Sequence, residues 1–505
     1  MDAVRERLLY FFNADPQYYD LVFVANATAA IKLVIDCLGD YCRSQRAPFW
    51  YGFHADSHTS IVGPRELADS HTYFRTDMDV QAWLGRRQTA GEPESVQIGL
   101  FAFPGQSNMS GRRLPLSWPG QIRQSSIQAG RTCYSLLDAA ALTSTAPLDL
   151  SEPELAPDFT ALSLYKIFGF PDLGALIVRK ASRSVLQKRV YFGGGTVDMV
   201  INAVNEKEAW VARKEILHKR LEDGTLPFHN IIALDSALST HARLYGTMSN
   251  VSKHTSALSK ILYDEMMARY HTNGVPLCVV YARDGNAYGD GRRQGPTIAF
   301  NIRDSKGDWV PKSDVEQLAT ANDIQLRTGG VCNPGGVAWA LNLTPRAMRD
   351  NYAEGLRCGN EIDILNDRPT GIVRVSLGAM STDKDIRCFL DFLDLFVDNG
   401  VDRDIETRSF SDSEYTQDPQ TGEVPCLIVN KNGMMTGRRC PVASCQAFMS
   451  NGEDATRHLG THGLAKKIHQ GRRSKEGLVS LLRKIWRKTS RSLCLNGLRA
   501  IVKQP

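Results

Sequence analysis

The hydrophobic pattern of the first 400 residues alternates short apolar runs with longer amphipathic segments. The runs at 98–103, 134–137 and 174–178 are almost wholly apolar, which is typical of strands buried on both faces. Between such runs lie segments with apolar residues at helical spacing, such as 29–38, where Gly39 is expected to close the helix. The alternation predicts an α/β unit with a mostly parallel sheet over residues 1–400.

The pattern changes after residue 400. Residues 401–425 contain few apolar side chains and many Asp, Ser, Thr, Glu, Gln, Pro and Gly, which predicts a linker. A segment with cysteines and histidines follows at 426–462. The last segment, 463–505, is basic and carries apolar residues at helical spacing, which predicts an amphipathic helix. We therefore expect one enzyme-sized unit with a short C-terminal extension.

The composition excludes several classes of protein. With 42% hydrophobic and 8% aromatic residues, the chain is not disordered throughout. The most apolar window, 21–38, contains Asn26, Lys32 and Asp36, so we expect no membrane-spanning helix. The first residues lack the apolar stretch of a secretory signal. Eleven cysteines, an odd number spread over 505 residues, suit a reducing compartment, and we expect a cytoplasmic protein.

The positive charge of the chain is concentrated at its end. Residues 463–505 hold twelve Lys and Arg and the single acid Glu476, a balance of +11. The net charge of +5 for the whole chain therefore leaves −6 for residues 1–462. Such a basic run contacts nucleic acid or an anionic membrane surface in some proteins and is a solvated terminus in most.

Two residues in the α/β unit together suggest a cofactor. Lys166 lies in a mostly apolar stretch before a turn with Gly169 and Pro171. It is either a surface lysine or an amine in a desolvated pocket, where a lowered pKa allows it to form a Schiff base. Asp138 ends a strand-like run 28 residues earlier. Pyridoxal phosphate needs such a pair: a lysine for its aldehyde and a carboxylate that keeps its ring nitrogen protonated.

The phosphate of that cofactor needs its own binding groups. Thr28 stands at the expected start of a helix, where its hydroxyl and the first backbone amides can hold a phosphate. The triple glycine 193–195 before Thr196 offers further free amides. Each signal is weak alone, because a threonine near a helix start is usually a cap and a glycine run is usually a turn.

Nine ordered motifs along residues 1 to about 395 resemble one family. They occupy residues 25–32, 56–63, 100–108, 137–140, 163–171, 191–196, 221–228, 327–335 and 373–378. Together they resemble the cysteine-desulfurase-like domain of molybdenum cofactor sulfurases. The resemblance implies the aminotransferase class V fold, with a large domain built on a mostly parallel sheet and a small α+β domain. It also implies a homodimer whose active sites lie at the subunit interface.

The resemblance also implies roles for individual residues. Lys166 corresponds to the Schiff-base lysine and Asp138 to the partner of the pyridine nitrogen. His58 corresponds to the residue that stacks on the ring, and Asn108 to a ligand near the ring hydroxyl. The expected phosphate ligands are Thr28 and Thr196, the latter from across the dimer.

Cys332 and Arg374 complete the expected site. Cys332 lies in a Gly-rich loop with Pro334 and with Arg327 five residues upstream, a setting that stabilises a reactive thiolate; the alternative is an inert buried thiol. The glycines around it suggest a loop able to move between substrate and acceptor. Arg374, on the strand-like run 372–376, is expected to hold the substrate carboxylate, unless it forms a structural ion pair.

These parts predict a pyridoxal-phosphate-dependent sulfurtransferase. L-cysteine is the expected substrate, Lys166 the base, and Cys332 the thiol that takes up sulfur as a persulfide while alanine leaves. The resemblance implies that the sulfur passes to molybdenum cofactor or to a molybdoenzyme. Two alternatives stay open: another lyase or transferase of the same fold, and an inactive homologue whose tail binds nucleic acid.

The sequence departs from the family pattern in three places. It enters the pattern about one helix-strand layer late, so a truncated gene is one interpretation. The stretch after residue 423 is too short for the large C-terminal domain of the family. Gly330 stands where many members have a further cysteine.

The C-terminal segment has its own candidate metal site. Cys440, Cys445, His458 and His462 have the spacing of a tetrahedral Cys2His2 zinc site, with both histidines on one helical turn. The alternative is that residues 440–448 are a remnant of the family's C-terminal domain. The sequence leaves both interpretations open.

Overall fold

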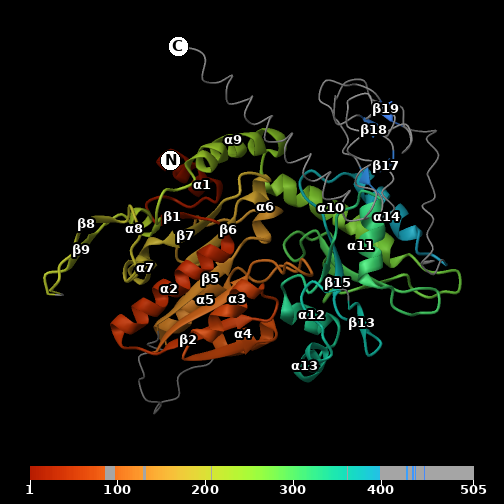
Figure 1. Ribbon diagram of the computed structural model, residues 1–505, viewed down its shortest axis with the longest axis horizontal. Coiled ribbons are helices and arrows are strands. Elements are labelled where there is room, and N and C mark those ends of the chain that lie inside the picture. Colours follow the sequence, from red (N-terminus) through yellow and green to blue (C-terminus); the bar gives the residue numbers. More distant parts are fainter. Residues whose placement is uncertain are drawn as a thin grey trace, which may run out of the picture. The chain divides into compact units, whose positions relative to one another are not determined.

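The computed structural model describes most of the first 398 residues and little of the remainder. The described ranges are 1–85, 97–128, 132–205, 207–360 and 362–398, with the backbone of four two-residue strands between 428 and 449. The chain forms two compact units, Met1–Glu406 and Thr407–Pro505. The elements that build the candidate site all belong to the first unit (Figure 1).

A seven-stranded sheet forms the centre of the large domain, in the order β1-β7-β6-β5-β4-β2-β3. Its strands are β1 (Tyr19–Val24), β2 (Phe49–His54), β3 (Ser70–Phe74), β4 (Ile98–Pro104), β5 (Thr132–Asp138), β6 (Phe159–Ser163) and β7 (Gly174–Arg179). Neighbouring strands are parallel along the row β3-β2-β4-β5-β6. Strand β7 is antiparallel to both of its neighbours, β6 and β1. The predicted mostly parallel sheet is confirmed.

Both faces of this sheet are buried. In β4, Leu100 and Ala102 belong to one hydrophobic core, whereas Phe101 and Phe103 belong to the other, because successive side chains point to opposite faces. One face is covered by α1 (Asp2–Phe11), α4 (Asp77–Leu84), α5 (Trp118–Gln128) and α9 (Phe228–Tyr245). The other is covered by α2 (Ala27–Gln45), α3 (Thr59–Val62), α7 (Arg183–Gln187) and α8 (Leu217–Leu221).

Helix α2 is longer than predicted. The expected helix ended at Gly39, but α2 continues to Gln45 and ends where Arg46 adopts a left-handed conformation, with φ of 52°. Leu38 and Cys42 lie on its buried face on either side of the glycine. Their packing against the sheet outweighs the cost of about 1 kcal/mol for a glycine inside a helix.

The small domain contains a four-stranded antiparallel sheet in the order β10-β11-β15-β12. Its strands are β10 (Cys278–Val280), β11 (Thr297–Ile302), β12 (Arg327–Gly329) and β15 (Ile372–Ser376). The helices of this domain are α10 (Met248–Met267), α11 (Lys312–Ala321), α12 (Pro334–Ala340), α13 (Pro345–Ala353) and α14 (Asp383–Asp394). Helices α10, α11 and α14 cover an apolar core that includes Phe300 and Phe389. A further two-stranded sheet pairs β13 (Ile364–Leu365) with β14 (Arg368–Pro369). The expected α+β character is confirmed.

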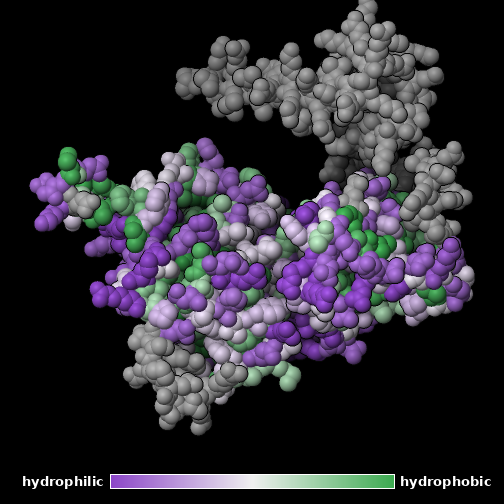
Figure 2. All heavy atoms as spheres, turned by 60° about the horizontal axis from the view of Figure 1, so that its bottom comes forward, coloured by the Kyte–Doolittle hydropathy of each residue, from purple (hydrophilic) through white to green (hydrophobic). Residues whose placement is uncertain are grey.

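A hairpin extends from the large domain. Strands β8 (Val197–Ile201) and β9 (Trp210–Arg213) pair with each other and with no other strand of the described residues (Figure 1, left). Large apolar side chains are exposed along it: Met199 is 57% exposed, Ile201 44% and Trp210 55%. Apolar surface is also visible at this end of the molecule in Figure 2.

In the second unit the structure describes only backbone pairs: β16 (Ile428–Val429) with β17 (Met435–Thr436), and β18 (Arg438–Arg439) with β19 (Phe448–Met449). The predicted linker, the four predicted zinc ligands and the predicted helix in the basic tail lie outside the described residues. Among the residues that are described, no helix is long and apolar enough to cross a membrane.

Helix α1 is joined to the sheet by a buried ion pair. Arg5 and Glu222 are each 6% exposed at the side chain, and their charged groups lie 2.8 Å apart. Glu222 also accepts a hydrogen bond of 2.8 Å from the amide of Phe23 in β1. The Arg5 guanidinium lies 4.7 Å from the centre of the Phe23 ring. One pair thus connects α1, β1 and the end of α8.

We expect Arg5→Ala to lower the free energy of unfolding by about 3–5 kcal/mol, because it leaves the Glu222 carboxylate buried without its partner. Arg7→Ala is the matched control. Arg7 forms an exposed pair with Asp235, so its loss should cost less than about 1 kcal/mol. Urea denaturation measures both values, and equal losses would show that the Arg5 pair is not the stronger connection.

Candidate active site

Five of the expected site residues lie at one edge of the large sheet. Strands β1, β2, β4, β5 and β6 run in the same direction, so their carboxyl ends share an edge. Ligands bind at this edge in open α/β sheets. The segments that leave it carry Thr28 after β1, His58 after β2, Asn108 after β4, Asp138 at the end of β5 and Lys166 after β6.

Asp138 and His58 lie within electrostatic reach of each other and of Lys166. Asp138 is 8% exposed, and its Oδ1 accepts a hydrogen bond of 3.0 Å from the amide of Ala140. Burial lowers the pKa of His58, the charge of Asp138 opposes that shift, and the charge of Lys166 adds to it. The Nδ1 atom of His58 accepts from the amide of Ser60 at 3.1 Å, so the neutral ring carries its proton on Nε2.

Lys166 lies on a one-turn helix, α6 (Tyr165–Phe168). The structure places its side chain among the exposed residues. Of the two interpretations of Lys166, the single chain shows the surface lysine, whereas its apolar neighbours Leu164 and Ile167 are buried. The backbone just before Lys166 is anchored to the start of α2, because the Ser163 hydroxyl accepts a hydrogen bond of 3.2 Å from the amide of Ala27.

The start of α2 is the expected phosphate position. Its cap is Asn26, whose side chain accepts from the amide of Ala29 at 3.0 Å, and not Thr28. Thr28 is exposed on the first turn, where its hydroxyl is available to a ligand. Gly174 permits this loop to lie close to β7, because a Cβ atom there would be 2.5 Å from the Cα of Asn26. The helix was predicted to begin at Ala29 and begins two residues earlier, so Thr28 lies inside its first turn and is not its cap.

Thr196 does not join these residues within one chain. It is buried, and its hydroxyl donates a hydrogen bond of 2.8 Å to the carbonyl of Gly193. It immediately precedes β8, on the hairpin that extends away from α6 (Figure 1). Within a single chain, the Thr196 hydroxyl therefore does not reach the expected phosphate position at the start of α2.

The Cys332 loop leads from β12 to α12 and crosses from the small domain to the sheet edge. Cys332 is exposed, as predicted, and both Val331 and Cys332 have left-handed backbones, with φ of 42° and 53°. The Val331 carbonyl accepts from Asn108 Nδ2 at 2.7 Å, and the Cys332 carbonyl accepts from the amide of Thr59 at 2.9 Å. The loop expected to move is thus held beside His58 in this structure.

Asn333 is a site residue that the sequence interpretation did not name. Its side chain is fully buried; Nδ2 donates to the Asp56 carbonyl at 3.2 Å and to Asn108 Oδ1 at 3.0 Å. Its Oδ1 caps α12 by accepting from the amide of Gly336 at 2.8 Å. An Asn directly before Pro334 signals a helix start. No signal in the sequence showed that the same amide also connects the two domains.

Arg374 lies on β15, where it is paired with Ala299 and Arg327 on the neighbouring strands. Its Nη1 donates to the Asn108 carbonyl at 2.6 Å, and its Nε is buried without a partner. Burial lowers the pKa of Arg374, Arg327 lowers it further, and Cys332 opposes both. No described carboxylate lies within ion-pair distance, so the structural ion pair is not found there. The guanidinium remains available to a carboxylate ligand.

Exposure separates Cys332 from several other cysteines. Burial raises the pKa of Cys37 and of Cys278 to about 12 and that of Cys42 to about 11, so these thiols stay protonated at neutral pH. Cys358 and Cys388 are exposed, as Cys332 is, but neither is hydrogen-bonded to the sheet edge in the described structure. Cys332 is the exposed thiol that the structure holds beside His58 and Arg374.

The comparisons with known proteins agree with this geometry. Residues 1–389 match the family model described as aminotransferase class V. The molybdenum cofactor sulfurase of Aspergillus clavatus is 53% identical over 398 residues, which are 78% of this chain and 46% of that protein. The one from Emericella nidulans is 52% identical over 456 residues, 89% of this chain and 51% of that protein. The chain spans about half the length of the curated relatives it matches.

Among solved structures, the cysteine desulfurase CsdA of Escherichia coli has a TM-score of 0.55 at 19% identity, covering 78% of this chain and 82% of that one. This likeness concerns the fold.

The Emericella nidulans alignment also bears on the C-terminal segment. It takes in 89% of the 505 residues, about 449, and so includes Cys440 and Cys445 wherever it starts. These two cysteines therefore lie within the stretch that is similar to that protein. Within the described ranges no group of His, Cys, Asp and Glu is arranged to hold a metal ion.

The charges around His58 predict opposite effects of two substitutions. Lys166→Ala should raise the pKa of His58, because it removes a nearby positive charge, and Asp138→Asn should lower it, because it removes a negative one. NMR titration of the cofactor-free protein, with the ring signal assigned through His58→Gln, measures both. Shifts in the same direction would show that the three groups are not arranged as described.

Proposed function

Because the chain belongs to the aminotransferase class V family, we propose that it is a pyridoxal-phosphate-dependent enzyme that transfers sulfur from L-cysteine to Cys332 and on to molybdenum cofactor or a molybdoenzyme. The observation that carries the proposal is the position of the Cys332 loop. Its backbone is hydrogen-bonded to Asn108 and Thr59, at the sheet edge that also presents Lys166 and Asp138. A thiol is thus held where an amine and a buried carboxylate converge.

The residues at this edge fit pyridoxal phosphate. Asp138 supplies a buried carboxylate for the ring nitrogen, and His58 supplies a flat neutral ring within reach. The start of α2, with Thr28 exposed on its first turn, suits a phosphate. Lys166 is exposed and therefore accessible to the aldehyde. When bound, this cofactor supplies an aldehyde that takes up the amine of an amino acid and a ring that accepts an electron pair.

The chain's own residues account for binding and proton movement. The Arg374 guanidinium holds the carboxylate of L-cysteine in a two-pronged contact. The Lys166 amine takes a proton from the substrate Cα. The Asp138 carboxylate holds a proton on the ring nitrogen, and Asn108 positions the Cys332 loop through Val331.

Sulfur transfer follows from the position of Cys332. Its thiolate attacks the sulfur of L-cysteine, so that an S–S bond forms as the substrate C–S bond breaks. The electron pair of the broken C–S bond goes to the substrate Cβ, which takes up a proton, and Lys166 returns the proton that it took from Cα, so that alanine leaves. Cys332 then carries the persulfide to the acceptor.

The proposal includes a homodimer formed through the β8–β9 hairpin. A single chain leaves Met199, Ile201 and Trp210 exposed on this hairpin, and a second copy would bury them. The glycines before β8 have open space around them: a Cβ atom at Gly194 or Gly195 would meet nothing within 4 Å. In such a dimer their amides, with Thr196, would reach the phosphate of the neighbouring site.

Substituting Cys332 tests the function. We expect Cys332→Ala to bind pyridoxal phosphate and L-cysteine but to release alanine at least about a hundredfold more slowly, because the nucleophile is lost. The matched controls are Cys358→Ala and Cys388→Ala, which remove other exposed thiols and should keep wild-type rates. Alanine assays and mass spectrometry of the persulfide provide the measurements.

The same preparations check the cofactor. Borohydride treatment should fix pyridoxal phosphate on Lys166 in both wild type and Cys332→Ala. Normal turnover by Cys332→Ala, or a persulfide on another cysteine, would contradict the mechanism while leaving the fold unaffected.

A charge on the hairpin tests the dimer. Ile201→Glu should weaken dimerisation at least about tenfold, since it places a carboxylate in an apolar contact. Ile232→Glu is the control, because Ile232 is 60% exposed on α9 and distant from the hairpin in sequence. Light scattering after size exclusion gives the masses. A monomeric wild type, or equal weakening by both variants, would exclude the hairpin as the interface.

A further inference from the structure

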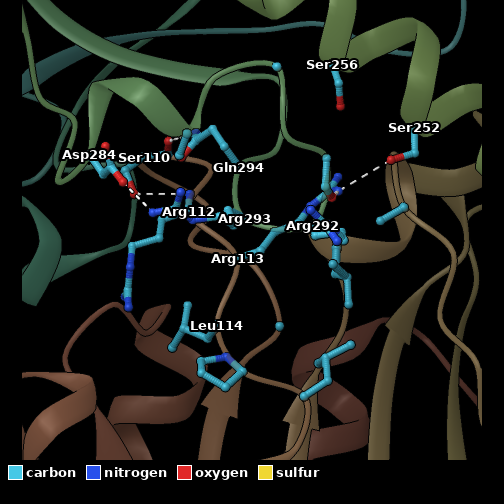
Figure 3. A pocket seen from close by; sticks show the side chains of 18 of the residues that line it. Ser110, Arg112, Arg113, Leu114, Ser252, Ser256, Asp284, Arg292, Arg293 and Gln294 are labelled. Carbon is cyan, nitrogen blue, oxygen red and sulfur yellow. Dashed lines mark hydrogen bonds and ion pairs between the residues drawn. The ribbon is translucent and has the colours of Figure 1, made fainter.

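A cavity in the first unit shares none of the residues assigned to sulfur transfer. It measures about 950 Å³ and is bounded by residues 110–116, the first half of α10 and the loop 283–294 (Figure 3). Its volume is that of a site for a small organic molecule. One wall is apolar and includes Leu114, Leu116, Leu142 and Pro147. The other walls carry six cations: Arg112, Arg113, Lys253, Arg283, Arg292 and Arg293.

Most of these arginines are already paired. Arg112 pairs with Asp56 at 3.3 Å and also with Asp77, and Arg293 pairs with Asp284. Arg283 lies 3.6 Å from Asp56 and over the Trp339 ring. Arg292 pairs with Asp290, but its side chain is 92% exposed. These ion pairs reduce the positive charge of the cavity walls without removing it.

Arg113 is the exception. It is 8% exposed, and its donors go to neutral oxygens: Gln106 Oε1 at 3.0 Å, the Thr145 carbonyl at 3.2 Å and the Gly291 carbonyl. No described carboxylate lies within ion-pair distance of it. Burial lowers its pKa to about 10. The charge of Asp290 partly opposes that shift, but no described carboxylate is in contact with the buried guanidinium, and a bound anion would offset the cost of its burial.

The serines of α10 supply the second observation. Ser249, Ser252, Lys253 and Ser256 line the cavity at the spacing of one helix face. Ser256 is 5% exposed, and its Oγ has no partner in the described structure although it points into the cavity (Figure 3). A buried hydroxyl without a hydrogen-bond partner destabilises the folded protein, and a hydrogen bond to a ligand oxygen would offset that cost.

Gly291 faces these hydroxyls. A Cβ atom on it would lie 2.7 Å from Ser256 Oγ and 2.8 Å from Ser252 Oγ. Arg113 Nη1 lies 3.5 Å from Ser252 Oγ. The hydroxyls and the guanidinium thus converge at one end of the cavity, opposite the apolar wall.

We propose that this cavity binds a phosphorylated small molecule, with its phosphate near Ser252, Ser256 and Arg113 and its organic part along Leu114 and Leu142. A phosphate offers several oxygens to converging hydroxyl and cationic donors, which a single carboxylate does not. Arg292 and Lys253, at the open side, add to the attraction. The site is separate from the position at α2 and does not depend on the proposed sulfur transfer.

The test is calorimetric titration of the full chain, preloaded with pyridoxal phosphate, with inorganic phosphate at constant ionic strength. We expect saturable binding by the wild type. The affinity for phosphate should fall at least about tenfold in the double variant Ser252→Ala, Ser256→Ala, which removes two hydroxyls without adding bulk. Thr255→Val is the control, since its hydroxyl is buried on the same helix but bonds to the Val251 carbonyl.

A second pair of variants covers the charge. Arg292→Gln should also weaken binding, whereas Arg387→Gln, which removes an exposed and paired arginine on α14, should not. Phosphate binding that is absent from the wild type would overturn the proposal. So would binding that the serine variant leaves unchanged, or that both controls reduce as much as the variants do.

Discussion

The burial of the central sheet on both faces is the constraint on which the rest of this structure depends. Because Leu100 and Ala102 face one core and Phe101 and Phe103 the other, β4 has no surface on which a polar group could sit. Polar chemistry is therefore confined to the ends of the strands. Since six of the seven strands run the same way, their carboxyl ends lie along one edge, and residues far apart in sequence meet there.

The small domain contributes to this edge of the large sheet through backbone hydrogen bonds more than through charged side chains. The bonds to the Val331 and Cys332 carbonyls fix the main chain of the loop, and the buried Asn333 amide joins the loop to Asp56 and Asn108. Main-chain bonds of this kind hold a segment in place while leaving its side chain accessible. Cys332 can thus be both well positioned and exposed.

Much of this arrangement could be predicted from the sequence, because strand runs and the residues that end them are local features. Asp138 at the end of β5 and the helix start near Thr28 are of this kind. Three features could not be predicted. The exposure of Lys166 depends on the packing around α6, and the length of α2 depends on burial beyond Gly39. The bridge made by Asn333 joins positions more than 220 residues apart in the chain.

The backbone of the Cys332 loop has a consequence for its movement. Two successive residues other than glycine in the left-handed region, Val331 and Cys332, cost about 1–3 kcal/mol each. The hydrogen bonds that hold them contribute about 0.5–1.5 kcal/mol each. The strain of the two residues therefore offsets the stabilisation that their hydrogen bonds provide, so these bonds alone do not hold the loop at the sheet edge, and the buried Asn333 side chain is needed as a further anchor.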